Sequence, residues 1–110
     1  MKKLKKDLPN QIKISAINYL VIPSKNKCFL NGRECYAMIN FDSHVINIDT
    51  SLQTVEGMKQ SLIHEILHGI VRDRDIEIKN EEKVVESFAK GLYQLFVDNP
   101  LFLNCFLEVV

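Results

Sequence analysis

The sequence predicts a small α+β domain in which a three-stranded antiparallel sheet packs on two helices. The first half of the chain alternates apolar and polar residues and is rich in β-branched residues, as strands are. The second half carries apolar residues at helical spacing between capping residues. A length of 110 residues fits a single domain spanning residues 1–110.

Three segments are expected to be strands. The first covers residues 12–22 and ends at Pro23, because proline interrupts a strand. The second covers residues 34–41 and follows the turn signal Asn31-Gly32. The third covers residues 44–49, and residues 41–44 supply a tight connection to it.

Two helices are expected after the strands. The first reaches about Arg72 and begins at a cap that is Thr50 or Ser51, or else Thr54. The second runs from the cap Asn80 to about Val97 and packs on the first through an apolar face. This face consists of Val84, Val85, Phe88, Leu92, Leu95 and Phe96. The apolar tail, residues 101–110, is expected to pack back onto the domain as a short helix.

Composition excludes several classes of protein. Fourteen basic residues balance fourteen acidic ones, so neither a nucleic-acid partner nor a membrane surface is expected. No apolar run approaches the ~18 residues that span a bilayer. Three cysteines without metal-knuckle spacing indicate a reducing compartment, and we expect a cytoplasmic protein. The basic start, residues 1–10, is expected to be a flexible solvated tail, with a weak nucleic-acid contact as the alternative.

The run His64-Glu65-Ile66-Leu67-His68 carries the strongest chemical signal. Residues four apart lie one above the other on a helix, so His64 and His68 can bind one Zn²⁺. Glu65 lies about 100° around the helix, where it can act as the general base toward a zinc-activated water without being a ligand. Gly69 leaves room for the close approach of another backbone or side chain.

A third ligand is expected from the second helix. Glu82 and Glu86 are four residues apart on one helical face, so one can bind zinc while the other orients a histidine. His44 is interpreted as an exposed histidine at a strand end, with a substrate contact as the alternative. Tyr93 is interpreted as core packing, with stabilisation of an oxyanion as the alternative.

Three segments together resemble the ImmA/IrrE family of metallopeptidase-like proteins, in a compact branch common in phages and prophages. They are residues 46–49, residues 61–69 with the His-Glu-x-x-His signature, and residues 82–89, and residues 91–100 are similar to that branch. The resemblance implies a zincin-like fold with a glutamate ligand on the second helix, which favours Glu82. Glu86 stands where the family usually has Asn or Asp.

The resemblance also implies a substrate, because family members act on transcriptional repressors of mobile elements. We therefore expect a zinc-dependent metallopeptidase that cleaves a protein or peptide, with the third strand binding an extended chain by edge addition. The alternative is a non-catalytic, zinc-containing phage regulator that binds another protein.

Overall fold

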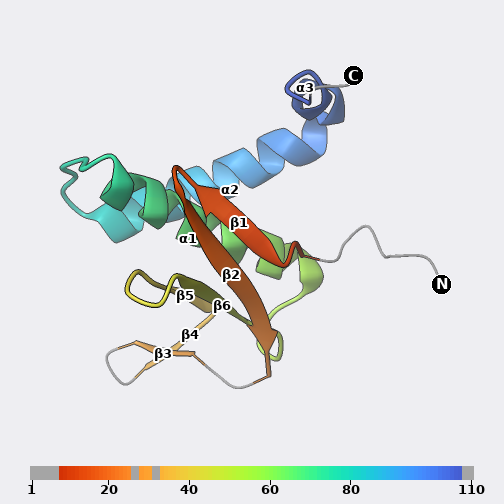
Figure 1. The fold of residues 1–110 in the computed structure, drawn as a ribbon. Helices are drawn as coiled ribbons and strands as arrows, with labels where there is room; N and C mark the ends of the chain where they lie inside the picture. The colour runs from red at the N-terminus through yellow and green to blue at the C-terminus, as the bar shows by residue number, and fades with distance from the viewer. Residues whose placement is uncertain (1–7, 26–27, 31–32, 108–110) are drawn as a thin grey trace.

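The computed structural model describes residues 8–25, 28–30 and 33–107. All of its strands precede its helices along the chain (Figure 1). The strands are β1 (Gln11–Ile14), β2 (Ile17–Ser24), β3 (Cys28–Leu30), β4 (Arg33–Cys35), β5 (Ala37–Asn40) and β6 (Val45–Asp49). The helices are α1 (Val55–Asp73), α2 (Glu81–Asp98) and α3 (Pro100–Asn104). An α+β fold is confirmed, and most of the predicted basic tail lies outside the described residues.

The main sheet has four strands in the order β1-β2-β6-β5, so the predicted three-stranded antiparallel sheet is wrong. Strands β2 and β6 are parallel, whereas the other two pairs are antiparallel. The expected first strand, residues 12–22, is a hairpin, because the chain reverses at Ser15, whose φ of 55° lies in the left-handed region. Ile14 and Ile17 therefore face each other across the turn.

The expected second strand, residues 34–41, is also divided. It breaks at Tyr36, so that β4 pairs with β3 in a separate hairpin and β5 pairs with β6. The predicted turn at Asn31-Gly32 lies outside the described residues. The tight connection over residues 41–44 is confirmed: the Asn40 side-chain oxygen accepts hydrogen bonds from the Asp42 and Ser43 backbones, both at 2.9 Å.

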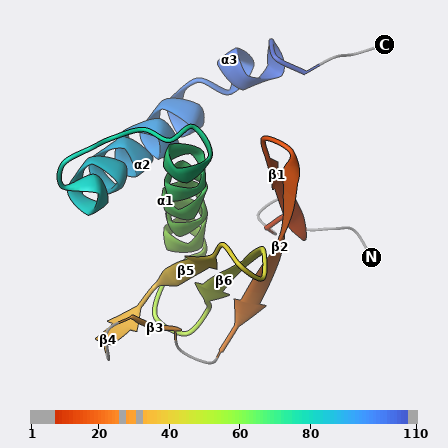
Figure 2. The same ribbon diagram turned by 60° about the vertical axis from the view of Figure 1, so that its left-hand side comes forward.

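The core lies between the sheet and α1, and α2 packs on the other side of α1 (Figure 2). Ile46 and Ile48 of the central strand β6 are fully buried there. A β-carbon at Gly69 would lie 2.7 Å from the Ile14 Cδ1 atom. The expected close approach is therefore confirmed: the absence of a side chain at Gly69 lets the β1–β2 hairpin contact α1.

Helix α1 begins at Thr54, whose hydroxyl accepts a hydrogen bond from the Gly57 backbone at 3.1 Å. The alternative caps, Thr50 and Ser51, are wrong. The buried Asp49 carboxylate accepts the Ser51 and Leu52 backbone N–H groups at 2.7 and 3.0 Å, and so holds this segment in a turn.

Helix α2 begins after Asn80, as predicted, but its packing differs from the prediction. Val85 and Ala89 are buried against α1, whereas Phe88 is 61% exposed. The predicted short helix at the tail is confirmed as α3, but its packing onto the domain is wrong, because Leu101 is 79% exposed. The end of α2 and α3 project from the body in both views (Figures 1 and 2), and we call residues 95–107 the C-terminal arm.

Candidate metal centre

Helix α1 presents two imidazoles from one face. His64 and His68 are four residues apart, and their Nε2 atoms lie 3.1 Å from each other. Both side chains are largely buried, with exposed fractions of 12% and 17%. The opposite side of the helix contributes Leu62 to the core and so fixes the direction in which the two imidazoles point.

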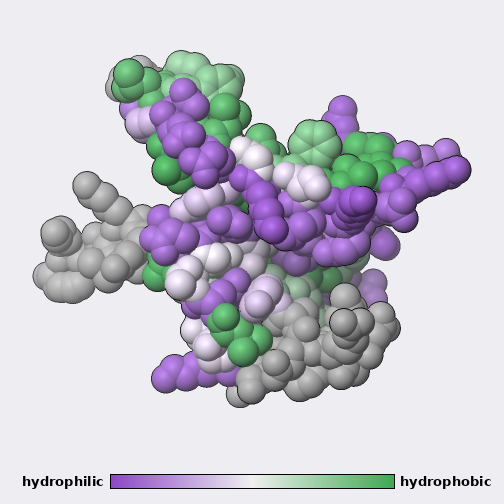
Figure 3. Space-filling model, turned by 180° about the vertical axis from the view of Figure 1, so that it is seen from behind, coloured by the Kyte–Doolittle hydropathy of each residue, from purple (hydrophilic) through white to green (hydrophobic). Residues whose placement is uncertain are grey.

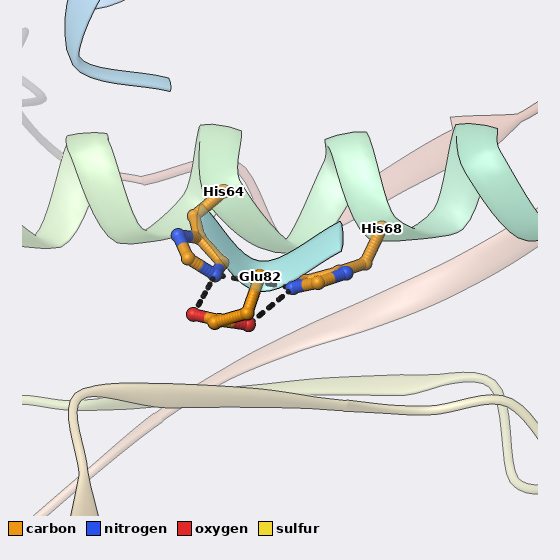
Figure 4. Close-up of side chains that lie close together, drawn as sticks. All are labelled: His64, His68 and Glu82. Carbon is orange, nitrogen blue, oxygen red and sulfur yellow. Dashed lines mark hydrogen bonds and ion pairs between the residues drawn. The ribbon is translucent and has the colours of Figure 1, made fainter. Parts of the chain in front are cut away.

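Helix α2 places the Glu82 carboxylate between these two rings (Figure 4). One oxygen lies 2.9 Å from the His64 Nε2 atom, and the other lies 2.9 Å from the His68 Nε2 atom. One donor atom from each of the three residues can be chosen so that all lie within 4.8 Å of one another. The structure therefore brings Glu82, rather than Glu86, to the point where the histidines converge.

The outer nitrogens of both rings are held by other carboxylates of α2. The His64 Nδ1 atom lies 2.8 Å from Glu86, and the His68 Nδ1 atom lies 2.7 Å from Glu81. A carboxylate only accepts hydrogen bonds, so each Nδ1 carries a proton and a neutral ring directs its Nε2 lone pair toward Glu82. Sequence reasoning missed Glu81, although its position directly before Glu82 in the first helical turn was a usable signal.

Charge and burial shift two pKa values in this cluster. Burial raises the pKa of Glu65, and the neighbouring His64 and His68 only partly oppose this effect. Burial would lower the pKa of His68, but the protonated ring can donate hydrogen bonds to both Glu81 and Glu82. These bonds and the charge of Glu65 outweigh burial and raise the pKa of His68. Glu65 is 7% exposed, and the backbone N–H of Ile39 in β5 hydrogen-bonds to its carboxylate.

The donor set fits a zinc ion. Two zinc ligands at ~2.0–2.1 Å in a tetrahedron lie about 3.3 Å apart, close to the 3.1 Å between the two Nε2 atoms and the 2.9 Å between each and Glu82. Two nitrogen lone pairs and a carboxylate converging on one point require a cation or protons between them. Two imidazoles and one carboxylate are also a donor set that catalytic zinc sites use.

A pocket of about 670 Å³ opens over this centre. His64, Glu65, His68, Glu82 and Glu86 line one side, and Tyr36 to Ile39 line another. The Asp49 N–H donates to the Tyr36 carbonyl at 2.9 Å, so Tyr36 and Asp49 form a hydrogen-bonded pair. Hydrogen-bonded and non-hydrogen-bonded pairs alternate along an antiparallel ladder, so Ala37 and Ile39 belong to non-hydrogen-bonded pairs. Ala37 and Ile39 therefore direct their backbone groups away from β6, toward the open edge of the sheet.

Two other predicted residues are not brought to this centre. His44 lies at the β5–β6 turn, where this exposed residue and Tyr19 pack in a T-shaped arrangement with ring centroids 5.5 Å apart. Tyr93 is not among the residues that line the pocket, whereas Tyr36 is. Sequence reasoning missed Tyr36 because the break between β4 and β5, which exposes it, carries no turn signal.

No protein-family model, curated protein or solved structure matches the chain. The resemblance to the ImmA/IrrE family therefore stays a prediction from the motifs. Among the described residues, no helix combines the length and apolar character that crossing a bilayer requires.

Proposed function

We propose that this protein is a zinc-dependent peptidase whose ligands are His64, His68 and Glu82. The observation that carries the proposal is the convergence of both Nε2 atoms on Glu82 beside a buried glutamate. A bound zinc ion would act as a Lewis acid that activates water and polarises the substrate carbonyl. Within this proposal Glu81 and Glu86 orient the two imidazoles rather than bind the ion.

Glu65 is the general base of the proposed reaction. It takes a proton from the attacking water and returns it to the leaving amine. Its raised pKa supports this role, because a carboxylate whose pKa lies closer to neutrality is a better base. The hydrogen bond from Ile39 orients the carboxylate relative to β5.

An extended peptide is the substrate class that the pocket favours. The outward backbone groups of Ala37 and the outward carbonyl of Ile39 can pair with a peptide strand added at the edge, while the Ile39 N–H stays on Glu65. This role falls to β5 and not to the predicted third strand, which is β6 and lies between β2 and β5. Within this proposal Tyr36, an exposed side chain that lines the pocket, contacts a substrate carbonyl. A repressor of a mobile element remains the substrate that the resemblance suggests.

The test compares Glu65→Gln with the wild type and with Glu56→Gln, an exposed control on the same helix. Zinc content is measured by elemental analysis, and hydrolysis is measured with a quenched-fluorescent peptide library. We expect all three proteins to bind about one zinc per chain. We expect only Glu65→Gln to lose hydrolysis, by at least about a hundredfold. Undiminished hydrolysis in Glu65→Gln would exclude the mechanism.

The second candidate is a zinc-containing module that binds another protein without cleaving it. The exposed apolar arm at the C-terminus favours it, because such surfaces mark interaction sites. On this hypothesis Glu65→Gln retains both zinc and its biological effect, whereas the peptidase hypothesis requires the effect to disappear.

A further inference from the structure

The C-terminal arm and the neighbouring Phe88 carry more of the exposed large apolar side chains than the rest of the described surface. Leu95, Val97 and five residues of the α3 region are exposed, and Phe88 adds to them. If a fully exposed large apolar residue presents roughly 180 Å², this surface is on the order of 800 Å². A stable interface buries about 800 Å² per partner, so these side chains offer enough apolar area for one.

The arm also has the form of a segment that inserts into a partner. It projects from the body in both views, and Figure 3 shows green, apolar atoms over much of the projecting end. Apolar side chains face several directions around α3, and Phe102 and Phe106 stack edge to face with centroids 5.0 Å apart. A segment that is apolar on several sides is buried fully only when another surface lies along it.

A shallow apolar hollow lies earlier on the same helix, α2. Ser87, Phe88, Gly91 and Leu92 line an almost wholly apolar hollow of about 250 Å³ on α2. Nothing lies within 4 Å of a β-carbon built at Gly91, so the space above Gly91 is empty. The hollow faces away from the metal centre, because Phe88 and Gly91 lie on the opposite side of α2 from Glu82 and Glu86.

We propose that two copies of this chain form a symmetric dimer in which each C-terminal arm covers the α2 hollow of the other copy. Leu95 stands midway between Phe88 and Phe102 in sequence. Leu95 also shares a face of α2 with Phe88 and Gly91, so a two-fold axis near Leu95 would bring the hollow of one α2 toward the α3 of an antiparallel partner, and the reverse. This complementarity favours a second copy over an unrelated protein, since a two-fold interface uses the same patch twice. A net charge of zero leaves no overall repulsion between copies.

The dimer is independent of the proposed peptidase function, and its test needs no metal or substrate. The full chain is studied by sedimentation equilibrium over a wide concentration range. We expect a mass of twice the 12.7 kDa of one chain. A wild-type protein that stays at the mass of one chain at every concentration would overturn the proposal.

Gly91→Glu is the decisive variant, because the fold has space for the side chain and glutamate has a higher helix propensity than glycine. A folding failure is therefore not expected. Two glutamates buried in one symmetric interface should raise the dimer dissociation constant by at least about a hundredfold. Ile76→Glu is the matched control, since Ile76 is a similarly exposed apolar residue between α1 and α2. A dimer that survives Gly91→Glu, or is lost in Ile76→Glu, would show that the arm and hollow are not the interface.

Discussion

Substitution of the α2 glutamates should weaken zinc binding in an order that the site geometry dictates. Glu82 faces both Nε2 atoms at 2.9 Å, so Glu82→Ala removes a ligand. Glu81 and Glu86 each contact one outer nitrogen, at 2.7 and 2.8 Å. Loss of such an outer partner lowers metal affinity by about 10- to 100-fold. We expect Glu81→Ala and Glu86→Ala to fall within this range, and Glu82→Ala to exceed it.

The assay is a competition titration against a chromophoric zinc chelator at fixed pH and ionic strength. Glu77→Ala is the control, because Glu77 is an exposed carboxylate between the two helices whose loss changes the net charge equally. An affinity of Glu82→Ala equal to that of the wild type would refute the assignment of the ligand. If Glu86→Ala binds zinc more weakly than Glu82→Ala does, Glu86 is the ligand and Glu82 orients a histidine.

Two further predictions concern stability. Gly69→Ala should raise stability in urea unfolding by less than the roughly 1 kcal/mol that helix propensity offers, because the added methyl group would lie 2.7 Å from the Ile14 Cδ1 atom, which must move. Ile14→Val removes the Cδ1 atom in conflict, so the gain from Gly69→Ala should be larger in the Ile14→Val background, and an unchanged gain would contradict the contact. In the metal-free protein, Glu65→Gln should be more stable than the wild type near neutral pH. The raised pKa of Glu65 means that the folded state holds its proton longer, so wild-type stability falls as pH rises from about 4.5 through the folded pKa. A difference in melting temperature between Glu65→Gln and the wild type that does not grow over this window would contradict the burial of Glu65.

The local part of the site could be predicted from the sequence. The spacing of His64 and His68 on a helix follows from helical geometry alone, and so does the separate direction of Glu65. The absence of a side chain at Gly69 is likewise a local property, whereas the sequence leaves the N-cap open among Thr50, Ser51 and Thr54, and only the structure shows that it is Thr54. Each of the local predictions depends on residues within a few positions of one another, so no knowledge of the packed structure was needed.

The non-local part could not be predicted. Ser15-Ala16 lacks the Gly, Asn or Pro that usually marks a hairpin, so residues 12–22 were interpreted as one strand. The choice between Glu82 and Glu86 depends on the position along α1 at which α2 packs. Burial of Val85 and Ala89, and not of Phe88, sets that position. An apolar stripe does not reveal which of its residues faces a neighbouring helix and which faces a partner chain.

The metal centre and the start of α2 depend on each other. Asn80 has a φ of 56° and makes no side-chain capping bond, so the helix begins without the usual local stabilisation. Its first two residues, Glu81 and Glu82, instead contact the α1 histidines directly. Four carboxylates, those of Glu65, Glu81, Glu82 and Glu86, then surround two imidazoles. A divalent cation would relieve the repulsion among these carboxylates and would hold the first turn of α2 against α1. Zinc binding should therefore order the start of α2 as well as complete the site, because the same contacts serve both purposes.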